Sequence, residues 1–225
     1  MKNRILLFSM LLAVFVLNAC GKTTAQPAKA QGTVPNSLQT IEAAAEDIID
    51  YAPSGGWDQI GNDVADIADA WKSYQPQAGK DGASQEIQEA MMTAIEKLQT
   101  ASEVKDAAAT MQGSNDVSAA VVEMFALYNP NIPADIGRLD VLERQLILDV
   151  AAHDYSAAKI SLAQTKSTWE KVKPTVLEHN GRDVAEEFET SLAAQEAGLN
   201  AKDDEVLTND ARNGLEIVDA LEQLY

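Results

Sequence analysis

Few residues of this chain combine the types and spacings that catalysis or metal binding requires. The sequence has one cysteine, Cys20, and two histidines, His153 and His179. A di-iron site in a helical bundle needs Glu-x-x-His pairs, because carboxylate and imidazole must project from successive turns, whereas valines stand three residues before both histidines. Neither histidine belongs to a His-x-x-x-His or His-Glu-x-x-His pattern, and one cysteine cannot form the Cys-x-x-Cys-His site of c-type haem. We therefore predict no metal site and no cofactor.

One pair of residues does have a catalytic spacing. Ser156 and Lys159 form Ser-x-x-Lys, which resembles the nucleophile motif of penicillin-binding enzymes, but the companion Ser-Asp-Asn and Lys-Thr-Gly motifs are absent. Acidic residues concentrate at three places, Asp63/Asp66, Glu186/Glu187/Glu189 and Asp203/Asp204/Glu205. Carboxylates of this kind could bind hard cations, but acidic residues that recur at helical spacing usually form a solvated face. We predict no catalytic residue and no enzymatic activity, with a hydrolase that uses Ser156 and Lys159 as the remaining enzymatic alternative.

The N-terminal residues are typical of a secretion signal. A basic start precedes an apolar run over residues 5–17, which is too short to span a membrane as a mature helix. The tetrad Leu17-Asn18-Ala19-Cys20 resembles the lipobox of bacterial lipoproteins. The resemblance implies that residues 1–19 are removed and that diacylglycerol and palmitate-type acyl chains on Cys20 anchor the protein. Because Gly21 follows Cys20, it also implies an outer-membrane location facing the periplasm if the cell is Gram-negative. The alternative is an ordinary signal peptide that contains a cysteine.

The charge of the chain restricts its partners. The formal net charge is −18 at pH 7, and removal of residues 1–19 would take away two basic residues and no acidic one. Such a field disfavours nucleic acid and anionic lipid surfaces, and it favours cationic partners. We therefore expect membrane contact through the lipid on Cys20 alone, no nucleic acid, and an envelope protein or small ligand as the partner.

The pattern of apolar residues predicts helices throughout. Residues 20–36 have almost no large apolar side chains, so we expect a flexible tether there. Beyond it apolar residues recur every three or four positions, and no segment alternates with period two for long enough to indicate a strand. We expect Ser37 to cap the first helix, Pro76 and Pro174 to end the second and sixth, and Gln112-Gly113-Ser114 to break the fourth. The predicted helices lie near 38–52, 57–75, 87–98, 102–128, 134–152, 155–172, 183–199 and 203–225.

The second half of the chain repeats the first. Residues 139–174 align with residues 41–76 at an offset of 98, and after a one-residue slip the alignment continues at 97 as far as Tyr128 and Tyr225. The matched positions are chiefly core-type. The sequence therefore predicts an all-α fold of duplicated four-helix units, about eight helices in two bundle-like halves, with the first helical unit at 37–130 and the second at 131–225. It leaves open whether the halves form separate bundles or one fused core.

Differences between the copies mark where copy-specific function would lie. His153 and Asp154 stand where the first copy has Gly55 and Gly56, and Glu170 replaces a lysine. His153, Asp154 and Glu170 are therefore the candidate copy-specific surface. Because pockets favour domain interfaces, we also expect interaction through a groove between the two units. The three tryptophans are expected to pack in the core.

One segment carries a family resemblance. Lys166-Ser167-Thr168-Trp169-Glu170-Lys171-Val172-Lys173-Pro174, in a secreted chain of two four-helix units, resembles the imelysin and EfeO-type group of periplasmic helical proteins. The resemblance implies a role in iron uptake. The metal motif of that group, Gly-x-His-x-x-Glu, has no counterpart, because Ser156 and Arg182 occupy the glutamate positions after the two histidines. No metal ligand is therefore carried over.

These observations lead to one functional hypothesis and one alternative. We expect a lipid-anchored extracytoplasmic helical binding or scaffold protein of the bacterial cell envelope, without enzymatic activity. The alternative is an accessory lipoprotein for the binding or uptake of a cation such as iron, which the acidic charge and the family resemblance favour.

Overall fold

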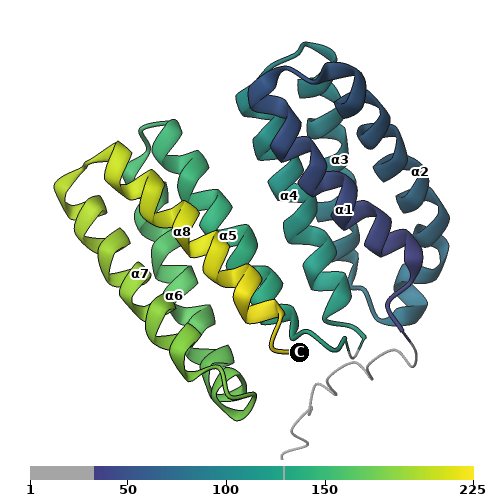
Figure 1. Cartoon of the computed structure of the whole chain (residues 1–225). Helices are drawn as coiled ribbons and strands as arrows, with labels where there is room; N and C mark the ends of the chain where they lie inside the picture. The colour runs from purple at the N-terminus through teal and green to yellow at the C-terminus, as the bar shows by residue number, and fades with distance from the viewer. Residues whose placement is uncertain (1–32, 129) are drawn as a thin grey trace, which may run out of the picture.

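The computed structural model describes residues 33–128 and 130–225. Within these ranges the chain forms α-helices and one short 3₁₀ turn, with no strand (Figure 1). The signal peptide, Cys20 and most of the tether predicted from the sequence lie outside the described residues. The helices are α1 (Asn36–Tyr51), α2 (Trp57–Asp81), α3 (Gln85–Glu103), α4 (Ala107–Phe125), α5 (Ala134–Ala151), α6 (Tyr155–Glu178), α7 (Arg182–Ala201) and α8 (Asp204–Glu222), with the 3₁₀ turn η1 (Ala52–Ser54) after α1.

The helices form two four-helix bundles. In the first, α1 and α3 each pack against both α2 and α4, and in the second α5 and α7 each pack against both α6 and α8 (Figure 1). The buried apolar side chains divide in the same way, into one cluster from α1–α4 and another from α5–α8. The all-α fold of duplicated four-helix units is thus confirmed, and each half has a core of its own.

The turns show that the duplication extends to the backbone. Three left-handed residues in each half end helices at aligned positions, and the residue after each donates its N–H to the carbonyl five residues before it. This is the geometry that closes a helix end with a six-to-one hydrogen bond. The aligned pairs are Gly55 with His153, Gly82 with Asn180 and Lys105 with Lys202. The one-residue slip lies in one turn, where Ala83-Ser84 of the first half corresponds to Gly181 alone in the second.

The two prolines that were expected to end helices lie inside them. Helix α2 continues past Pro76 to Asp81, and α6 continues past Pro174 to Glu178. Both prolines are exposed, and buried side chains stand two residues before and two residues after each of them, on the opposite, core-facing side of the helix. A proline removes one backbone hydrogen bond, at a cost of about 3 kcal/mol. That cost falls on the solvated side of the helix, and packing of the continuing apolar stripe offsets it, so the prediction was wrong.

Helix α4 is also continuous where a break was expected. A Cβ atom at Gly113 would lie 2.9 Å from the Leu98 Cα atom of α3, so the glycine serves a close approach of two helices rather than a break. Next to it, the Ser114 hydroxyl donates to the Ala45 carbonyl at 2.6 Å. The start of α1 differs as well, because Pro35 precedes Asn36 and no side chain caps the helix. The predicted Ser37 cap was therefore wrong.

The tryptophans occupy the expected positions. Trp71 and Trp169 are 6% and 1% exposed, at aligned sites in the two cores, and Trp57 is half-buried against the first core. Their spacing on one helical face is explained by core packing. None of the described helices has both the length and the apolar character that crossing a membrane would demand.

Candidate binding cleft at the junction of the bundles

The two bundles are joined by the packing of α4 against α5. A Cβ atom at Gly137 of α5 would lie 3.1 Å from the Val122 Cγ2 atom of α4, so the helices approach closely here. The Arg138 guanidinium donates to both carboxylate oxygens of Glu123, at 2.6 and 2.9 Å. The buried Asn115 amide donates to the Val141 carbonyl at 3.2 Å. Bidentate pairs of this kind constrain geometry, so these contacts fix how the bundles meet.

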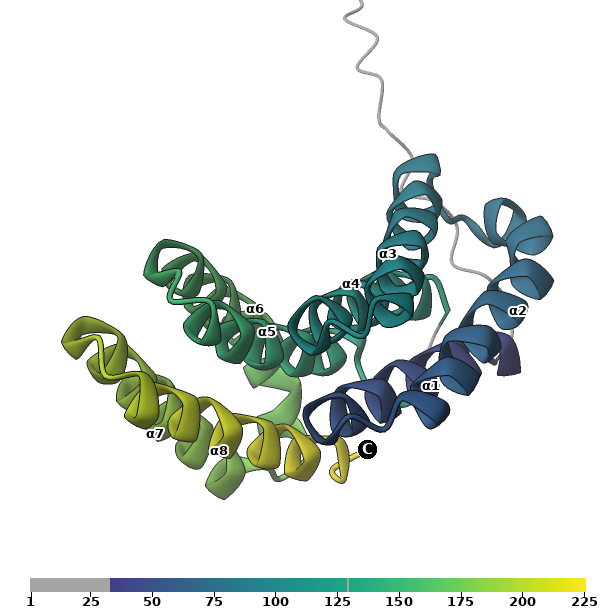
Figure 2. The ribbon, with the colours of Figure 1, turned by 90° about the horizontal axis from the view of Figure 1, so that it is seen from above.

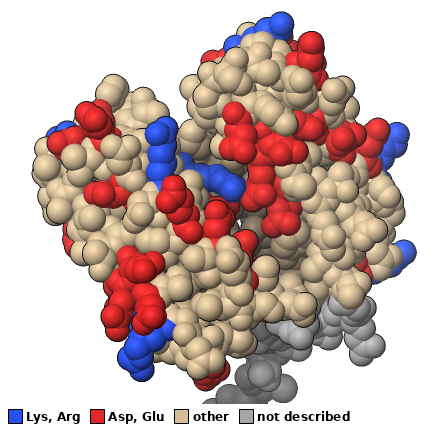
Figure 3. All heavy atoms as spheres, viewed as in Figure 1, with Lys and Arg blue, Asp and Glu red and all other residues tan. Residues whose placement is uncertain are grey.

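A cleft opens beside this contact because only one of two equivalent contacts is closed. By the repeat, α4 corresponds to α8 and α5 to α1, so the contact between α4 and α5 has its counterpart in α1 and α8. These two helices lie on the same side of the α4–α5 pair without packing closely together (Figure 2). They form the walls of a hollow whose floor is α4 and α5 (Figure 3). We call this hollow the junction cleft.

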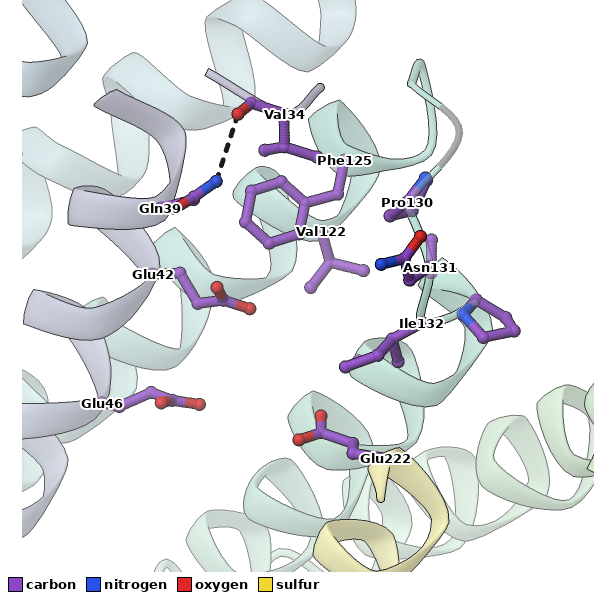
Figure 4. A pocket seen from close by; sticks show the side chains of 13 residues that line it. Val34, Gln39, Glu42, Glu46, Val122, Phe125, Pro130, Asn131, Ile132 and Glu222 are labelled. Atoms are coloured by element: carbon purple, nitrogen blue, oxygen red, sulfur yellow. Dashed lines mark hydrogen bonds between the residues drawn. The ribbon is translucent and has the colours of Figure 1, made fainter. Parts of the chain in front are cut away.

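The junction cleft consists of two pockets. The acidic pocket, of about 340 Å³, lies near the segment that links the bundles, and Figure 4 shows its lining. Its carboxylates come from Glu42 and Glu46 of α1 on one side and from Glu222 of α8 on the other, and the apolar side chains of Val122, Phe125 and Ile132 complete the lining. The second pocket, of about 440 Å³, which we call the arginine pocket, is lined by Ile49, Asp50, Asp140, Arg144, Arg212 and Asp219, among others.

Helical spacing explains why these side chains share the cleft. On α1 the cleft residues are at 39, 42, 46 and 49, with Asp50 next to the last of them, and on α8 at 212, 215, 219 and 222. Intervals of three and four keep them on one face, while the buried stripe of each helix faces its own core. Each helix thus has an apolar face for folding and a charged face for the cleft.

An ion pair separates the two pockets. Arg144 lies 3.1 Å from Glu46 of α1 and 2.6 Å from Asp140, one turn earlier on α5. Its side chain is only 17% exposed. At an offset of 98, Glu46 is the repeat counterpart of Arg144, so each residue contacts its own counterpart and both lie near the axis that relates the two halves. If both copies had kept the same charged residue at this position, the two side chains would repel each other. Because one copy has Glu46 and the other has Arg144, they attract each other instead.

Three carboxyl groups of the cleft, those of Glu42, Asp140 and Glu222, have raised pKa values. Burial raises the pKa of Glu42 to about 7, with further contributions from Glu46, Glu222 and Asp140, while Arg144 acts in the opposite direction. Burial also raises the pKa of Asp140 to about 7, although Arg144 lowers it. The pKa of Glu222 is raised by its burial, then by the nearby Glu46 carboxylate. Burial and like charges both disfavour the ionised form, so an entering cation would find partly protonated carboxylates that it could ionise.

The structure places the residues predicted from the sequence outside this cleft. His153 and Asp154 lie in the turn between α5 and α6, where the His153 Nδ1 atom is 2.9 Å from the Asp204 carboxylate. Asp154 accepts the N–H groups of Ser156 and Ala157 at the start of α6. Glu170 is exposed on α6, about 24 Å further along at 1.5 Å per residue. The structure thus brings His153 and Asp154 together, apart from Glu170.

Sequence reasoning missed the cleft carboxylates although a signal was present. The comparison of the two copies recorded the changes at His153, Asp154 and Glu170, but not the reversal from Glu46 to Arg144. Across the described residues, no three His, Cys, Asp or Glu side chains are placed to hold a metal ion together. Ser156 and Lys159 are exposed in the first turns of α6.

A second unusual cluster lies in the core of the second bundle. Glu143 is fully buried, and the Gln195 amide donates to both of its carboxylate oxygens, at 3.1 and 2.9 Å. A Cβ atom at Gly214 would lie 2.7 Å from the Glu143 Cδ atom, so a larger residue there would have to displace the carboxyl group. Burial raises the pKa of Glu143 to about 8, although the Gln195 hydrogen bond lowers it. Glu143 is therefore mostly neutral at pH 7. We call Glu143, Gln195 and Gly214 the polar core cluster.

The polar core cluster and the junction cleft lie on different faces of α5. Asp140 faces the cleft and Glu143 faces the core, and the charge on Asp140 is one of the causes that raise the pKa of Glu143.

Comparison of the chain with protein-family models, with curated proteins and with solved structures gave no match.

Proposed function

We propose that this chain is a lipid-anchored extracytoplasmic binding or scaffold protein of the bacterial cell envelope, without enzymatic activity, that holds its partner in the junction cleft. The observation that carries the proposal is the cleft itself. Its walls are the charged faces of α1 and α8, which belong to different bundles. Clefts between folded units are common binding sites, and useful ones combine apolar area with a few polar groups. The acidic pocket has both.

The anchoring part of the proposal rests on the sequence. The lipobox tetrad that ends at Cys20 would place the acyl chains ahead of a tether of 20–36, so the bundles would stand off from the membrane surface. The acidic net charge of the chain, −18, supports this arrangement, because the folded part would be repelled by anionic lipid. A binding protein tethered in this way would present the cleft to partners in the surrounding compartment.

Cys20→Ala tests the anchor. We expect wild-type protein expressed in a Gram-negative host to incorporate a palmitate analogue and to sediment with membranes, and the variant to do neither. Equal labelling of both proteins would contradict lipid attachment at Cys20.

A photo-reactive amino acid tests the cleft. Ile132 lines the acidic pocket and is 37% exposed, whereas Ile160 is 59% exposed on α6, outside both pockets of the cleft. We expect cross-linking in intact cells to give a discrete adduct from position 132 and none, or a weaker one, from position 160. The same adduct from both positions, or none from either, would contradict a partner in the cleft.

The second candidate is accessory binding or uptake of a cation such as iron. The observation in its favour is the gathering of Glu42, Glu222 and Asp140 at the cleft with raised pKa values. We rank it second because the Arg144 guanidinium already forms ion pairs with Asp140 and Glu46. Calorimetric titration with ferric, ferrous, cupric and calcium ions tests it, and binding no tighter than millimolar would rule it out.

A further inference from the structure

We propose that the acidic pocket of the junction cleft binds a short basic amphipathic segment of a partner protein, with a lysine or arginine beside an apolar residue. This inference rests on the proposed function and specifies the chemistry of the partner.

The lining of the pocket combines carboxylates with apolar side chains. Glu42 and Glu222 come from α1 and α8 and point toward the pocket from different bundles (Figure 4). Phe125 and Ile132 lie across from the α1 carboxylates, with Ile132 37% exposed. A ligand that fills this space therefore needs a cation between the carboxylates of the two helices and an apolar group beside it. Lysine and arginine side chains next to an apolar residue meet both requirements, because their alkyl stems also cover apolar surface.

The charge of the pocket lacks a counterpart within its lining. The described residues around it include three glutamates and neither lysine nor arginine. Arg144 pairs with Glu46 from the neighbouring pocket, so Glu42 and Glu222 are the carboxylates left to meet a partner. Their raised pKa values have the same cause, burial together with neighbouring carboxylates. A basic side chain placed between them would relieve this repulsion, which is the charge complementarity that selects partners at interfaces.

The length of the cleft favours a chain segment over a small cation. The cleft follows α8 from Arg212 to Glu222, a distance of ten residue steps or about 15 Å at 1.5 Å per residue. An extended segment of about five residues spans that distance. A free amine or metal ion would occupy only the acidic end and leave the apolar side chains of both pockets uncovered.

Defined peptides test the inference with the full-length protein purified in detergent. The probes are fluorescent six-residue peptides with blocked ends, in which leucine alternates with lysine, glutamine or glutamate. We expect the lysine peptide to bind at least roughly tenfold more tightly than the glutamine peptide, with an affinity that falls as salt is added, and the glutamate peptide not to bind. Equal binding of the lysine and glutamine peptides would overturn the inference.

Matched variants locate the site. The double variant Glu42→Gln/Glu222→Gln should weaken binding of the lysine peptide by roughly fivefold, because each partly exposed ion pair contributes modestly. The control Glu186→Gln/Glu187→Gln removes two exposed charges of α7 outside the cleft and should leave affinity unchanged. Ile132→Asn should weaken binding while the salt dependence persists. If the control weakens binding as much as the cleft variant, the attraction is a property of the whole acidic surface and the inference fails.

The peptides and the cross-linking experiment separate the two proposals. A discrete adduct from position 132 in cells, without binding of the lysine peptide, would support the proposed function and overturn the basic segment. Site-dependent peptide binding without an adduct in cells would support the chemistry of the pocket and overturn the proposed function.

Discussion

The two bundles have the same helix order and the same turns, yet they differ at the centre of their cores. Where α1, α3 and α4 meet in the first bundle, three fully buried apolar side chains pack together, and the aligned positions of the second bundle hold a carboxyl group, an amide and no side chain at all. The pairs are Ala45 with Glu143, Leu98 with Gln195 and Val117 with Gly214. The second core has thus exchanged two large apolar side chains for a hydrogen-bonded polar pair.

The three differences make physical sense only as a set. Glu143 needs the space that Gly214 leaves, because a Cβ atom there would lie 2.7 Å from the carboxyl carbon. Its carboxylate oxygens need a donor, which Gln195 provides at 2.9 and 3.1 Å. A buried polar group without a partner costs about 1–3 kcal/mol, so any single change would leave the others unsatisfied. The same backbone thus accepts an apolar or a polar centre, provided that all three positions change together.

The polar centre gives the second bundle a dependence on pH that its apolar counterpart lacks. Glu143 lies on α5, which also contributes Asp140 and Arg144 to the cleft and packs against α4. Protonation in the core and charge in the cleft are therefore linked through one helix.

Gly214→Val should have the largest effect. It restores the residue of the first bundle while Glu143 remains, so two groups compete for the same space. Overpacking of a core usually costs about 1–3 kcal/mol, and displacement of the carboxyl group from Gln195 adds to it, so we expect a loss of about 3 kcal/mol or more. Urea unfolding measures the change.

Gly61→Ala is the matched control for that variant. Gly61 lies inside α2 of the first bundle, and no atom lies within 4 Å of a Cβ added there. Replacement of an exposed glycine in a helix should raise the free energy of unfolding by about 1 kcal/mol. Equal effects of the two substitutions would show that Gly214 is not required for space.

The pH dependence of stability should come next in size. The pKa of Glu143 is raised from 4.5 to about 8 in the folded chain, so the folded state binds a proton that the unfolded state releases between these values. The resulting stabilisation is complete below about pH 4.5 and is lost as the pH rises through about 8, on the order of 1 kcal/mol per pH unit. Urea unfolding at pH 5 to 9 should show this slope for the wild type and a smaller one for Glu143→Gln. The same slope in both proteins would exclude Glu143 as its source.

The triple exchange Glu143→Ala/Gln195→Leu/Gly214→Val should convert the second core into the first. Replacement of buried polar groups by packed apolar side chains is often stabilising, so we expect a gain of roughly 1–3 kcal/mol at pH 8 and a weaker pH dependence. Each exchange alone should destabilise. A triple variant less stable than Gly214→Val alone would mean that the surrounding residues of the two cores are not interchangeable.

The sequence predicts the part of this structure that depends on periodic apolar residues. Helix number, order and duplication follow from the stripes, and the buried Trp71 and Trp169 lie where the stripes place them. The helix end predicted at Pro76 was wrong because the low helix propensity of proline is outweighed by the packing of the apolar stripe that continues beyond it. The break predicted at Gly113 was wrong for a different reason. From the sequence alone, a glycine that breaks a helix cannot be distinguished from a glycine that lets two helices approach.

The junction cleft was only partly predictable. A groove between two units was expected. Which helix faces line it depends on how α4 packs against α5, and nothing in the sequence indicates which residues of these two helices contact each other. The aligned copies did contain a usable signal at two places. The reversal from Glu46 to Arg144 marks the axis of the cleft, and the appearance of Glu143 on an apolar stripe marks the polar core.

Exchange of the charges at Glu46 and Arg144 should have the smallest effect on the free energy of unfolding. It tests directly whether the two copies stabilise each other through this pair. Arg144→Glu gives the second copy the residue of the first, so Glu46, Asp140 and position 144 would become like charges, and we expect a loss of about 1–2 kcal/mol. Glu46→Arg/Arg144→Glu reverses the pair and should recover about half, because the contact with Glu46 is restored while the one with Asp140 is not. A double-mutant cycle measured by urea unfolding gives the coupling energy, expected at about 1 kcal/mol. Additive effects of the two substitutions would show that the two copies do not stabilise each other through this pair, and the cleft would then be held by the α4–α5 contact alone.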